Sequence, residues 1–316
     1  MSLRIENPGA FTTVQDLGRF GHEKDAFGRS GAMDVFSVRY ANRLLENTDD
    51  CAVLEMTLLG IRARAEKELY VAFAGGDFPL KINGREAPSR TVLRLGKGDV
   101  FECGAARAGC RGYLAVRGGF TVPPVLGSRS TNLRCAAGGF HGRKLAAGDV
   151  VPADAPQEGA AYLSGRTFPA PPERNAGPCR LRVLFGPQDG LFSAEEKERF
   201  LSEVFRVTPL SDRMGIRLAG RAVRTLSGSA DIVSDGIVPG AVQIPKDGQP
   251  IVLAADCQTT GGYAKIACVI SADLPALGQL RPGDPVRFAP CTRRAAVRAL
   301  RRMERDLPMK IRRMDG

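Results

Sequence analysis

The chain has 316 residues, 43% of them hydrophobic, with 37 Gly, 21 Pro and a net charge of +11. This length accommodates about two domains of roughly 150 residues each. The many Gly and Pro favour a loop-rich, mainly β protein over a helical bundle. No segment is apolar over a bilayer-spanning length, and the N-terminus lacks a signal peptide's apolar core, so we expect a cytoplasmic protein without membrane contact.

The cysteine and histidine content excludes several reaction classes. Eight Cys occur without a CxxC pair, and the only histidines are His22 and His141. The sequence therefore lacks the cysteine spacing of a zinc site or a disulfide framework and has few histidines for a His-dependent triad. We expect no metal.

In chain order, the first predicted element is a helix capped by Asp34 that carries an apolar face from Val35 to Leu45. From Ala52 to Phe120, short apolar runs alternate with Gly and Asp about every ten residues, as in a small barrel or sandwich. These features assign residues 1–165 to an N-terminal β-rich domain with an early helix.

A segment rich in Pro, Ala and Gly, residues 152–178, predicts the boundary between domains. Beyond it, Ser193 and Glu196 form a capping box that opens a helix, and strand patterns continue to about Ala289. Residues 178–290 are therefore assigned to a second domain. A Gly-Asp turn that leads into a strand recurs three times, in LGKGDVF, LAAGDVV and LRPGDPVRF, and indicates two related β units.

The positive charge is concentrated at the C-terminus. Residues 291–316 contain nine Lys or Arg and three Asp or Glu, a net +6, which leaves +5 for the other 290 residues. Thr292 is placed to cap a helix in which Leu300 and Met303 recur with alanines at helical spacing. We interpret this segment as a basic C-terminal helix and tail that docks through its apolar side. Contact with an acidic partner is the alternative, and the lack of interleaved aromatics does not favour nucleic acid.

Candidate chemistry lies in polar clusters of the second half. In SDRMG, Arg213 offers a fixed fork for a carboxylate or phosphate, and Asp212 could hold it or act as a base. The alternative is that both residues stabilise a turn before the strand IRLAG, and the sequence does not choose between these interpretations. In QIPKDGQP, residues 243–250, Gln243 lies beside a tight hairpin that requires a residue such as Gly248.

The segment DCQTTGGY, residues 256–263, offers hydroxyls and backbone N–H groups within a few residues, followed by Lys265. Such a cluster predicts an anion or oxyanion nest, with ordinary turn chemistry as the alternative. No P-loop or dinucleotide fingerprint occurs. We therefore predict catalytic roles for Asp212, Arg213, Asp256 and Lys265, and substrate binding by Ser211, Gln243, Gln258, Thr259, Thr260, Gly261, Gly262 and Tyr263.

Several motifs together resemble one protein family. They are NPGAFTTVQDLGRFG, SGAMD, LEMTLLG, YLAVRGGF, LGSRST, GRKLAAGD, SDRMGIRLAG and the run from Ser234 to Asp284. Over residues 5–288 the chain resembles the second subunit of the bacterial allophanate hydrolase-like pair, a family that includes the C subunit of ATP-dependent 5-oxoprolinase. It is also similar to part of the carboxyltransferase region of urea carboxylase. Two positions depart from the family pattern: Gly28-Arg29 replaces a Pro pair, and Cys257 replaces a frequent Arg.

The resemblance implies a mainly β fold with two cyclophilin-like β-barrel-type units and a few helices. It also implies an amide (lactam) hydrolase subunit of a complex that uses ATP to cleave 5-oxoproline to glutamate. The partners would be a related first subunit, the B type of 5-oxoprolinase, and a third subunit, the A type. ATP would be used by the complex, whether or not this chain binds it.

Two alternatives stay open. One is a biotin-dependent carboxyltransferase component that acts on urea or a related amide; because the chain has no Met-Lys-Met attachment sequence, the biotin would be carried by another protein. The other is a non-catalytic regulatory partner that antagonises a first-subunit-type protein. Both enzymatic interpretations require N–H donors or cations that stabilise negative charge on an amide-like oxygen in a dry pocket.

Overall fold

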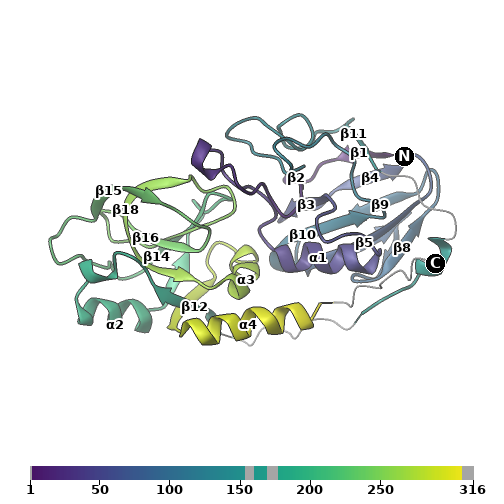
Figure 1. Ribbon diagram of the computed structural model, residues 1–316. Coiled ribbons are helices and arrows are strands. Elements are labelled where there is room, and N and C mark those ends of the chain that lie inside the picture. The colour runs from purple at the N-terminus through teal and green to yellow at the C-terminus, as the bar shows by residue number, and fades with distance from the viewer. Residues whose placement is uncertain (1, 154–159, 169–176, 308–316) are drawn as a thin grey trace. The chain divides into compact units, whose positions relative to one another are not determined.

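Strands dominate the residues that the computed structural model describes, which are 2–153, 160–168 and 177–307 (Figure 1). These residues form two units. Unit 1 contains the described residues up to Arg19, those from Ser30 to Phe168, and those from Arg305 onward. Unit 2 contains Phe20–Arg29 and the described residues from Gly177 to Glu304. Much of the expected boundary at 152–178, and the tail beyond 307, lies outside the described residues.

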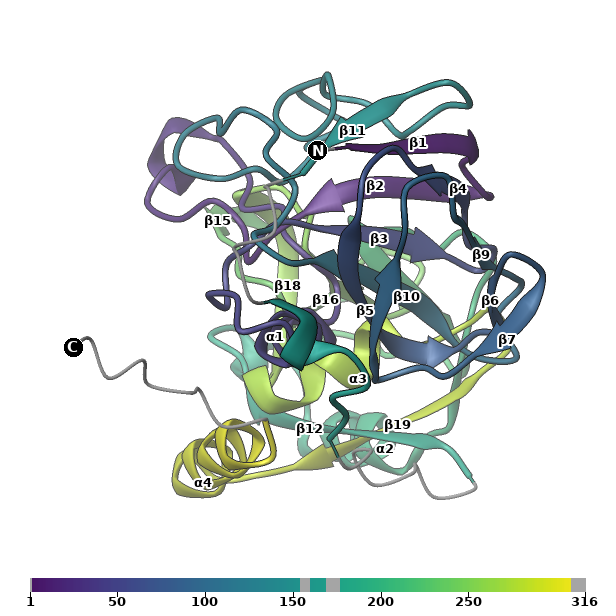
Figure 2. The same ribbon diagram turned by 90° about the vertical axis from the view of Figure 1, so that its right-hand side faces the viewer.

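Unit 1 is built on two antiparallel sheets that enclose a hydrophobic core (Figure 2). The core receives side chains from both, for example Leu3 and Phe101 from one sheet and Met56 and Leu114 from the other. The first sheet has the order β11 (Val150–Pro152), β1 (Ser2–Asn7), β4 (Arg62–Ala65), β9 (Val100–Cys103), β6 (Leu80–Ile82) and β7 (Arg85–Ala87). The second has the order β2 (Phe11–Gln15), β3 (Val53–Thr57), β10 (Ala108–Val116), β5 (Leu69–Asp77) and β8 (Val92–Leu95).

The second sheet of unit 1 is covered on its other face by α1 (Val35–Leu44). Tyr113 and Ala115 of β10 face this helix, whereas Leu114 and Val116 face the core between the sheets. A strand buried on both faces needs a continuous apolar run, which explains YLAV in β10 and LYVAFA in β5. The predicted cap is confirmed: the Asp34 carboxylate accepts a hydrogen bond from the Ser37 N–H. A short 3₁₀ turn, η2 (Ala160–Leu163), follows later in the chain.

Unit 2 is a seven-stranded closed barrel with one extra strand (Figure 1). The sheet closes because β12 pairs with both β19 and β18, and β15 adds to the outer edge of β18. These findings confirm the expected mainly β fold with barrel-type units. The strand order is β12 (Cys179–Phe185), β19 (Pro285–Pro290), β13 (Phe205–Val207), β14 (Gly215–Ala219), β17 (Ile251–Leu253), β16 (Ala241–Ile244), β18 (Thr260–Val269) and β15 (Asp231–Gly236).

Apart from the C-terminal helix, the helical elements of unit 2 have at most nine residues. In α2 (Ala194–Ser202), Ser193 caps the helix by accepting from the Glu196 N–H, as predicted. Phe200 is the one buried residue of α2, and its ring stacks on Phe288 of β19 at a centroid distance of 4.4 Å. The remaining short elements are η1 (Glu23–Asp25), η3 (Asp189–Leu191), η4 (Ser271–Asp273) and α3 (Leu274–Gly278).

The three Gly-Asp turns have the same local structure. Gly98, Gly148 and Gly283 have φ values of 90°, 92° and 91°, a left-handed conformation that favours glycine. In each turn the following Asp accepts a hydrogen bond from the backbone N–H three residues before it. A strand begins directly afterwards, β9, β11 or β19. The recurring sequence therefore encodes one turn used three times.

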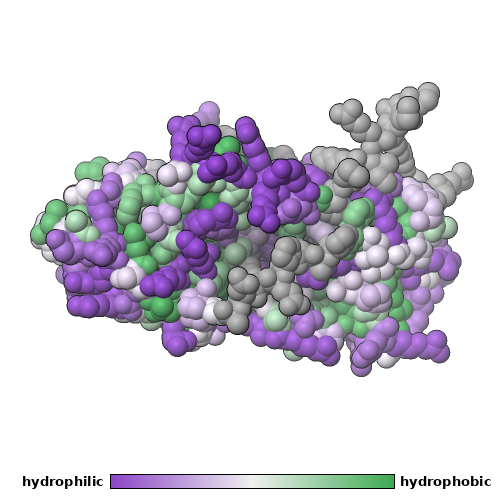
Figure 3. Space-filling view, turned by 90° about the horizontal axis from the view of Figure 1, so that it is seen from below, coloured by the Kyte–Doolittle hydropathy of each residue, from purple (hydrophilic) through white to green (hydrophobic). Residues whose placement is uncertain are grey.

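The basic segment forms α4 (Arg293–Arg305), and the predicted cap is present because the Thr292 hydroxyl accepts from the Ala295 N–H. None of its residues is fully buried, but Ala295, Ala296, Ala299 and Met303 are half-buried. The expected docking through the apolar side stays a prediction. Figure 3, seen from the side on which α4 lies in Figure 1, shows long hydrophilic side chains on the surface. Within the described part of the chain, no helix is long and apolar enough to cross a membrane.

Candidate functional site in the barrel of unit 2

Two of the candidate residues, Gln243 and Lys265, lie where β16, β17 and β18 meet. Gln243 of β16 lies opposite Lys265 of β18 and Ile251 of β17 in the strand register. Opposite residues of an antiparallel pair project from the same face of a sheet. A register shift between Val242 and Gln243 adds a residue to β18 at this point, a bulge that re-aims the following side chains. The strand pairing thus brings Gln243 and Lys265 together although they are distant in sequence.

A pocket of about 590 Å³ opens in unit 2 beside these strands. Gln258, Thr259 and Thr260 form one part of its wall, and Ile237 and Pro239 contribute an apolar part. Three of the predicted substrate-binding residues therefore line a common pocket. Small-molecule sites typically combine an apolar wall with a few placed polar groups, as here.

Gln243 lies behind this wall with an unused donor. Its side chain is 2% exposed, and its Nε2 has no hydrogen-bond partner within the described part of the chain. A Cβ atom at Gly261 would lie 2.8 Å from Gln243 Nε2 and 3.4 Å from Gln258 Nε2, so the two carboxamides converge at this glycine. A buried N–H group without a partner is rare in proteins and calls for a functional or structural explanation.

Lys265 is buried and holds an ion pair at the same side of the barrel. Its Nζ lies 3.0 Å from Asp235 Oδ2, and the Gln188 amide donates to the same oxygen at 3.1 Å. The Lys265 ammonium is the main cause that lowers the pKa of Asp235. Asp235 itself is exposed, so in this ion pair the carboxylate contacts solvent while the Lys265 ammonium is buried.

Arg213 and Asp256 form a closed bidentate pair. Nε and Nη2 of Arg213 reach the two Asp256 carboxylate oxygens at 2.8 and 3.0 Å, and both side chains are largely buried. The Asp256 N–H also donates to the Arg213 carbonyl at 2.8 Å. The pair therefore fastens the loop after β17 to the loop before β14, and neither residue lines the pocket. Their catalytic roles stay predictions.

Ser211 and Asp212 take part in turn geometry. The Asp212 carboxylate accepts from the N–H groups of Met214 and Gly215, and the Ser211 hydroxyl accepts from the N–H of Arg217. Asp212 is exposed and does not hold Arg213, whose fork is occupied by Asp256. The structure thus agrees with the turn interpretation of Asp212 and places Ser211 in the same turn, while their predicted catalytic and substrate-binding roles stay predictions.

The expected nest at Thr259–Gly262 is not formed. Thr260, Gly261 and Gly262 begin β18, and their backbone pairs with β15, for example Gly261 opposite Asp235. Neither glycine has a positive φ, whereas a nest alternates right- and left-handed residues. The two glycines are therefore strand residues that pair with β15. Tyr263 lies opposite Asp231 in the same pairing and is 40% exposed.

Part of the pocket wall comes from a segment that the sequence did not mark as functional. Phe20–Arg29, which we call the arm, supplies Glu23, Lys24, Gly28 and Arg29 to the pocket. The residues that flank the arm in sequence belong to unit 1, where Arg19 Nε donates to the Val125 carbonyl and the Ala32 N–H donates to the Asp16 carbonyl. The one signal in the sequence was the departure at Gly28-Arg29 from the family pattern.

Cys257 also lines the pocket, and burial raises the pKa of its thiol to about 12. A thiol with so high a pKa is not a nucleophile near neutral pH. It packs with Ile237, Ala241 and Leu253 in a small apolar cluster. Cys257 is thus an apolar wall residue of the pocket.

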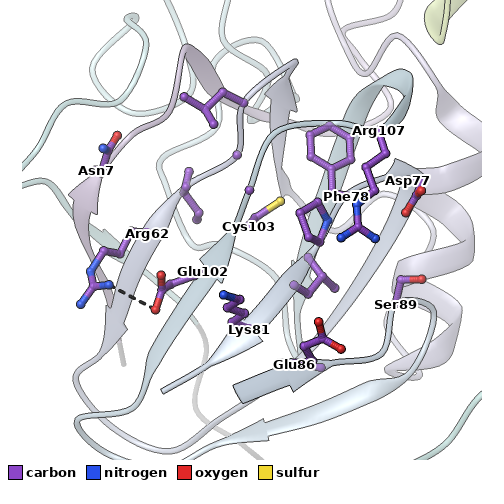
Figure 4. Close-up of a pocket in the computed structure, with 17 residues that line it drawn as sticks. Asn7, Arg62, Asp77, Phe78, Lys81, Glu86, Ser89, Glu102, Cys103 and Arg107 are labelled. Carbon is purple, nitrogen blue, oxygen red and sulfur yellow. Dashed lines mark ion pairs between the residues drawn. The ribbon is translucent and has the colours of Figure 1, made fainter. Parts of the chain in front are cut away.

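Unit 1 has a second pocket, of about 710 Å³, over β9 and β6 (Figure 4). Arg62, Glu102, Lys81 and Glu86 face one another across successive strands, and Arg62 binds Glu102 at 3.1 Å. Such rows of alternating charge stabilise the surface of an antiparallel sheet. None of the predicted site residues lies here, and we assign it no function.

The comparisons with known proteins place the chain in a family. The model of the carboxyltransferase domain, subdomain A and B, matches residues 26–290. The chain therefore belongs to the carboxyltransferase domain family.

Relatives of known name fall into two groups. The chain is similar to the C subunit of the 5-oxoprolinase of Escherichia coli, with 34% identity over 96% of each chain. It is also similar to the urea amidolyase of Lachancea kluyveri, with 33% identity over 93% of this chain but 17% of the relative. Among solved structures, the urea carboxylase of Kluyveromyces lactis superposes with a TM-score of 0.89 at 29% identity, over 98% of this chain and 30% of that one.

Proposed function

We propose that the chain is a subunit of a 5-oxoprolinase-type complex that cleaves 5-oxoproline to glutamate with ATP. The observation that supports this most is the length of the match. The similarity to the C subunit of the E. coli 5-oxoprolinase extends over 96% of both chains, whereas it covers only 17% of the urea amidolyase. The sequence thus matches the C subunit over nearly all of that relative's length, which supports the assignment to a 5-oxoprolinase-type complex.

The pocket in unit 2 supplies groups that suit an amide substrate. Cleavage of a lactam places negative charge on the carbonyl oxygen, which hydrogen-bond donors stabilise. Gln258, Thr259 and Thr260 line the pocket and offer such donors. Gln243 is a positioning residue in this proposal: its unused Nε2 and the Gln258 Nε2 both lie near the space beside Gly261. Rotating the Gln258 carboxamide by 180° exchanges its oxygen and nitrogen, so its oxygen could then accept from Gln243.

ATP does not fit this pocket as its main site. Lys24 and Arg29 are the cations of its wall, and Glu23 balances one of their two charges. A triphosphate needs a larger set of cations or a phosphate-binding loop, and the sequence has no P-loop. We therefore place ATP binding on the partner proteins of the A or B type.

The second candidate is a biotin-dependent carboxyltransferase component that acts on urea or a related amide. The fold shared with the K. lactis urea carboxylase favours it. A ureido group presents one carbonyl and two N–H groups, so the carboxamides and hydroxyls of the same pocket could bind it. A regulatory partner without catalysis is the third candidate.

Reconstitution separates these candidates. The chain is mixed with its cognate A-type and B-type partners, ATP and 5-oxoproline, and glutamate is measured. Glutamate that forms only in the complete mixture supports the proposal. Turnover that requires urea and a biotinylated carrier supports the second candidate, and a stable complex without turnover on any amide supports the third.

A further inference from the structure

The arm gives the pocket a positive wall. Glu23, Lys24 and Arg29 are its charged lining residues, and another part of the wall, formed by Gln258, Thr259 and Thr260, is polar but uncharged. One of the two cations balances Glu23, so the lining carries a net positive charge. The pocket thus separates a charged side from a side that offers neutral hydrogen-bonding groups.

Arg29 is held so that part of its fork is available. Its Nε donates to Glu23 Oε1 at 2.9 Å, and its guanidinium lies over the Phe20 ring at 4.4 Å from the centroid. Within the described residues, Nη1 and Nη2 of Arg29 have no hydrogen-bond partner. The ion pair and the ring fix the plane of the guanidinium, and two of its nitrogens stay able to bind an anion.

A ligand that uses both sides needs an anionic group and an amide. We propose that Arg29 makes this pocket selective for small amides or lactams that also carry a carboxylate, with Arg29 binding the carboxylate while Gln258 and the threonines bind the amide. This inference rests on the proposed function and goes further, because it assigns the carboxylate to a residue of the arm. Neutral amides such as urea would lack that contact.

The inference is tested by binding of two ligands to the full chain. 5-Oxoproline carries a lactam and a carboxylate, and 2-pyrrolidone is the same ring without the carboxylate. Affinities are measured by NMR titration for the wild type, Arg29→Gln, Arg29→Lys and Arg221→Gln. Arg221 is an exposed arginine of unit 2 outside the pocket and serves as the matched control.

Arg29→Gln should weaken 5-oxoproline binding about 10- to 100-fold, since a hydrogen bond to a charged group is lost, and leave 2-pyrrolidone binding unchanged. The affinity of Arg29→Lys for 5-oxoproline should lie between those of the wild type and Arg29→Gln, because lysine keeps the positive charge but lacks the guanidinium's paired donors. Arg221→Gln should bind both ligands as the wild type does. If Arg29→Gln loses equal affinity for both ligands, Arg29 has a structural role only. If it loses affinity for neither, Arg29 has no role in binding. Either result overturns the inference but leaves the proposed lactam site in place. If the wild type binds neither lactam, the proposed site itself is wrong, and the inference with it.

Discussion

At the scale of single residues, Gln243 combines a stability cost with a predicted function. Its buried Nε2 lacks a partner, and an unsatisfied buried polar group costs about 1–3 kcal/mol. Gln243→Met keeps the side-chain length and removes this donor. We predict that the variant is more stable by about 1 kcal/mol in denaturant unfolding and that it binds 5-oxoproline at least about tenfold more weakly.

Gln249 is the matched control for that prediction. Its carboxamide is satisfied, because it accepts from the Gly220 N–H and donates to the Gly220 carbonyl. Gln249→Met should therefore lower stability, by about 1 kcal/mol, without changing ligand affinity. If Gln243→Met is less stable than the wild type and binds the ligand normally, Gln243 is a structural residue only.

Gly261 offers a second prediction at this scale. An added Cβ would meet Ile237 Cδ1 at 2.5 Å and Gln243 Nε2 at 2.8 Å, so both side chains would have to move. Gly261→Ala should lose about 1–3 kcal/mol of stability and weaken lactam binding. At Gly262 the nearest atom, the Ile232 carbonyl oxygen, lies at 3.4 Å, so Gly262→Ala should lose less. Equal losses in the two variants, measured by urea unfolding, would contradict the proposed role of space at Gly261.

At the scale of elements, local signals predicted structure well. The caps at Asp34, Ser193 and Thr292 are all formed, and the repeated Gly-Asp turns precede strands as the sequence indicated. These features depend on residues within a few positions of one another. The glycine pair 261–262 misled us because glycine is typical of a turn, whereas both residues here lie in β18. Gly261 allows close packing of Ile237 and Gln243, which are distant in sequence.

The loop after α1 gives a prediction for pH. Burial would raise the pKa of Asp49, but hydrogen bonds from Arg43 and Arg39 outweigh it and lower the pKa to about 2. Because the folded state binds its proton less readily than the unfolded state, this stabilisation is present above about pH 4 and is lost as the pH falls toward 2.

Asp49→Asn should therefore be less stable than the wild type by about 1–2 kcal/mol at pH 6, since one pKa unit corresponds to about 1.4 kcal/mol. The difference should shrink between pH 4 and 2. Unfolding curves of both proteins across this range measure it. A difference that is independent of pH would mean that the two arginines do not act through the charge of Asp49.

The helix α2 is attached to the barrel through one aromatic side chain. Phe200 is fully buried and contacts Phe205 and Phe288, whereas its neighbour Leu201 is only partly buried. Phe200→Ala should cost about 3–5 kcal/mol in unfolding free energy, and Leu201→Ala clearly less. Comparable losses in the two variants would show that α2 is not held by this ring cluster.

At the scale of the whole molecule, the sequence predicted a mainly β chain with barrel-type units, and the structure confirms it. It did not predict that the arm clusters with unit 2, because no local pattern in residues 20–29 encodes a partner more than two hundred positions away. The same limit explains why the sequence did not indicate the ion pair between Asp235 and Lys265, which forms across the β15–β18 pair. Pairing between distant strands decides which predicted residues meet.

The central claim is that the pocket in unit 2 binds a small amide. A crystal structure of the chain soaked with 5-oxoproline tests it most directly. We predict a ligand within hydrogen-bond distance of Gln258 and Thr259 or Thr260, with the Gln258 carboxamide turned toward Gln243. A ligand bound elsewhere, or an occupied pocket in which neither Gln258 nor a threonine contacts the lactam, would contradict the claim.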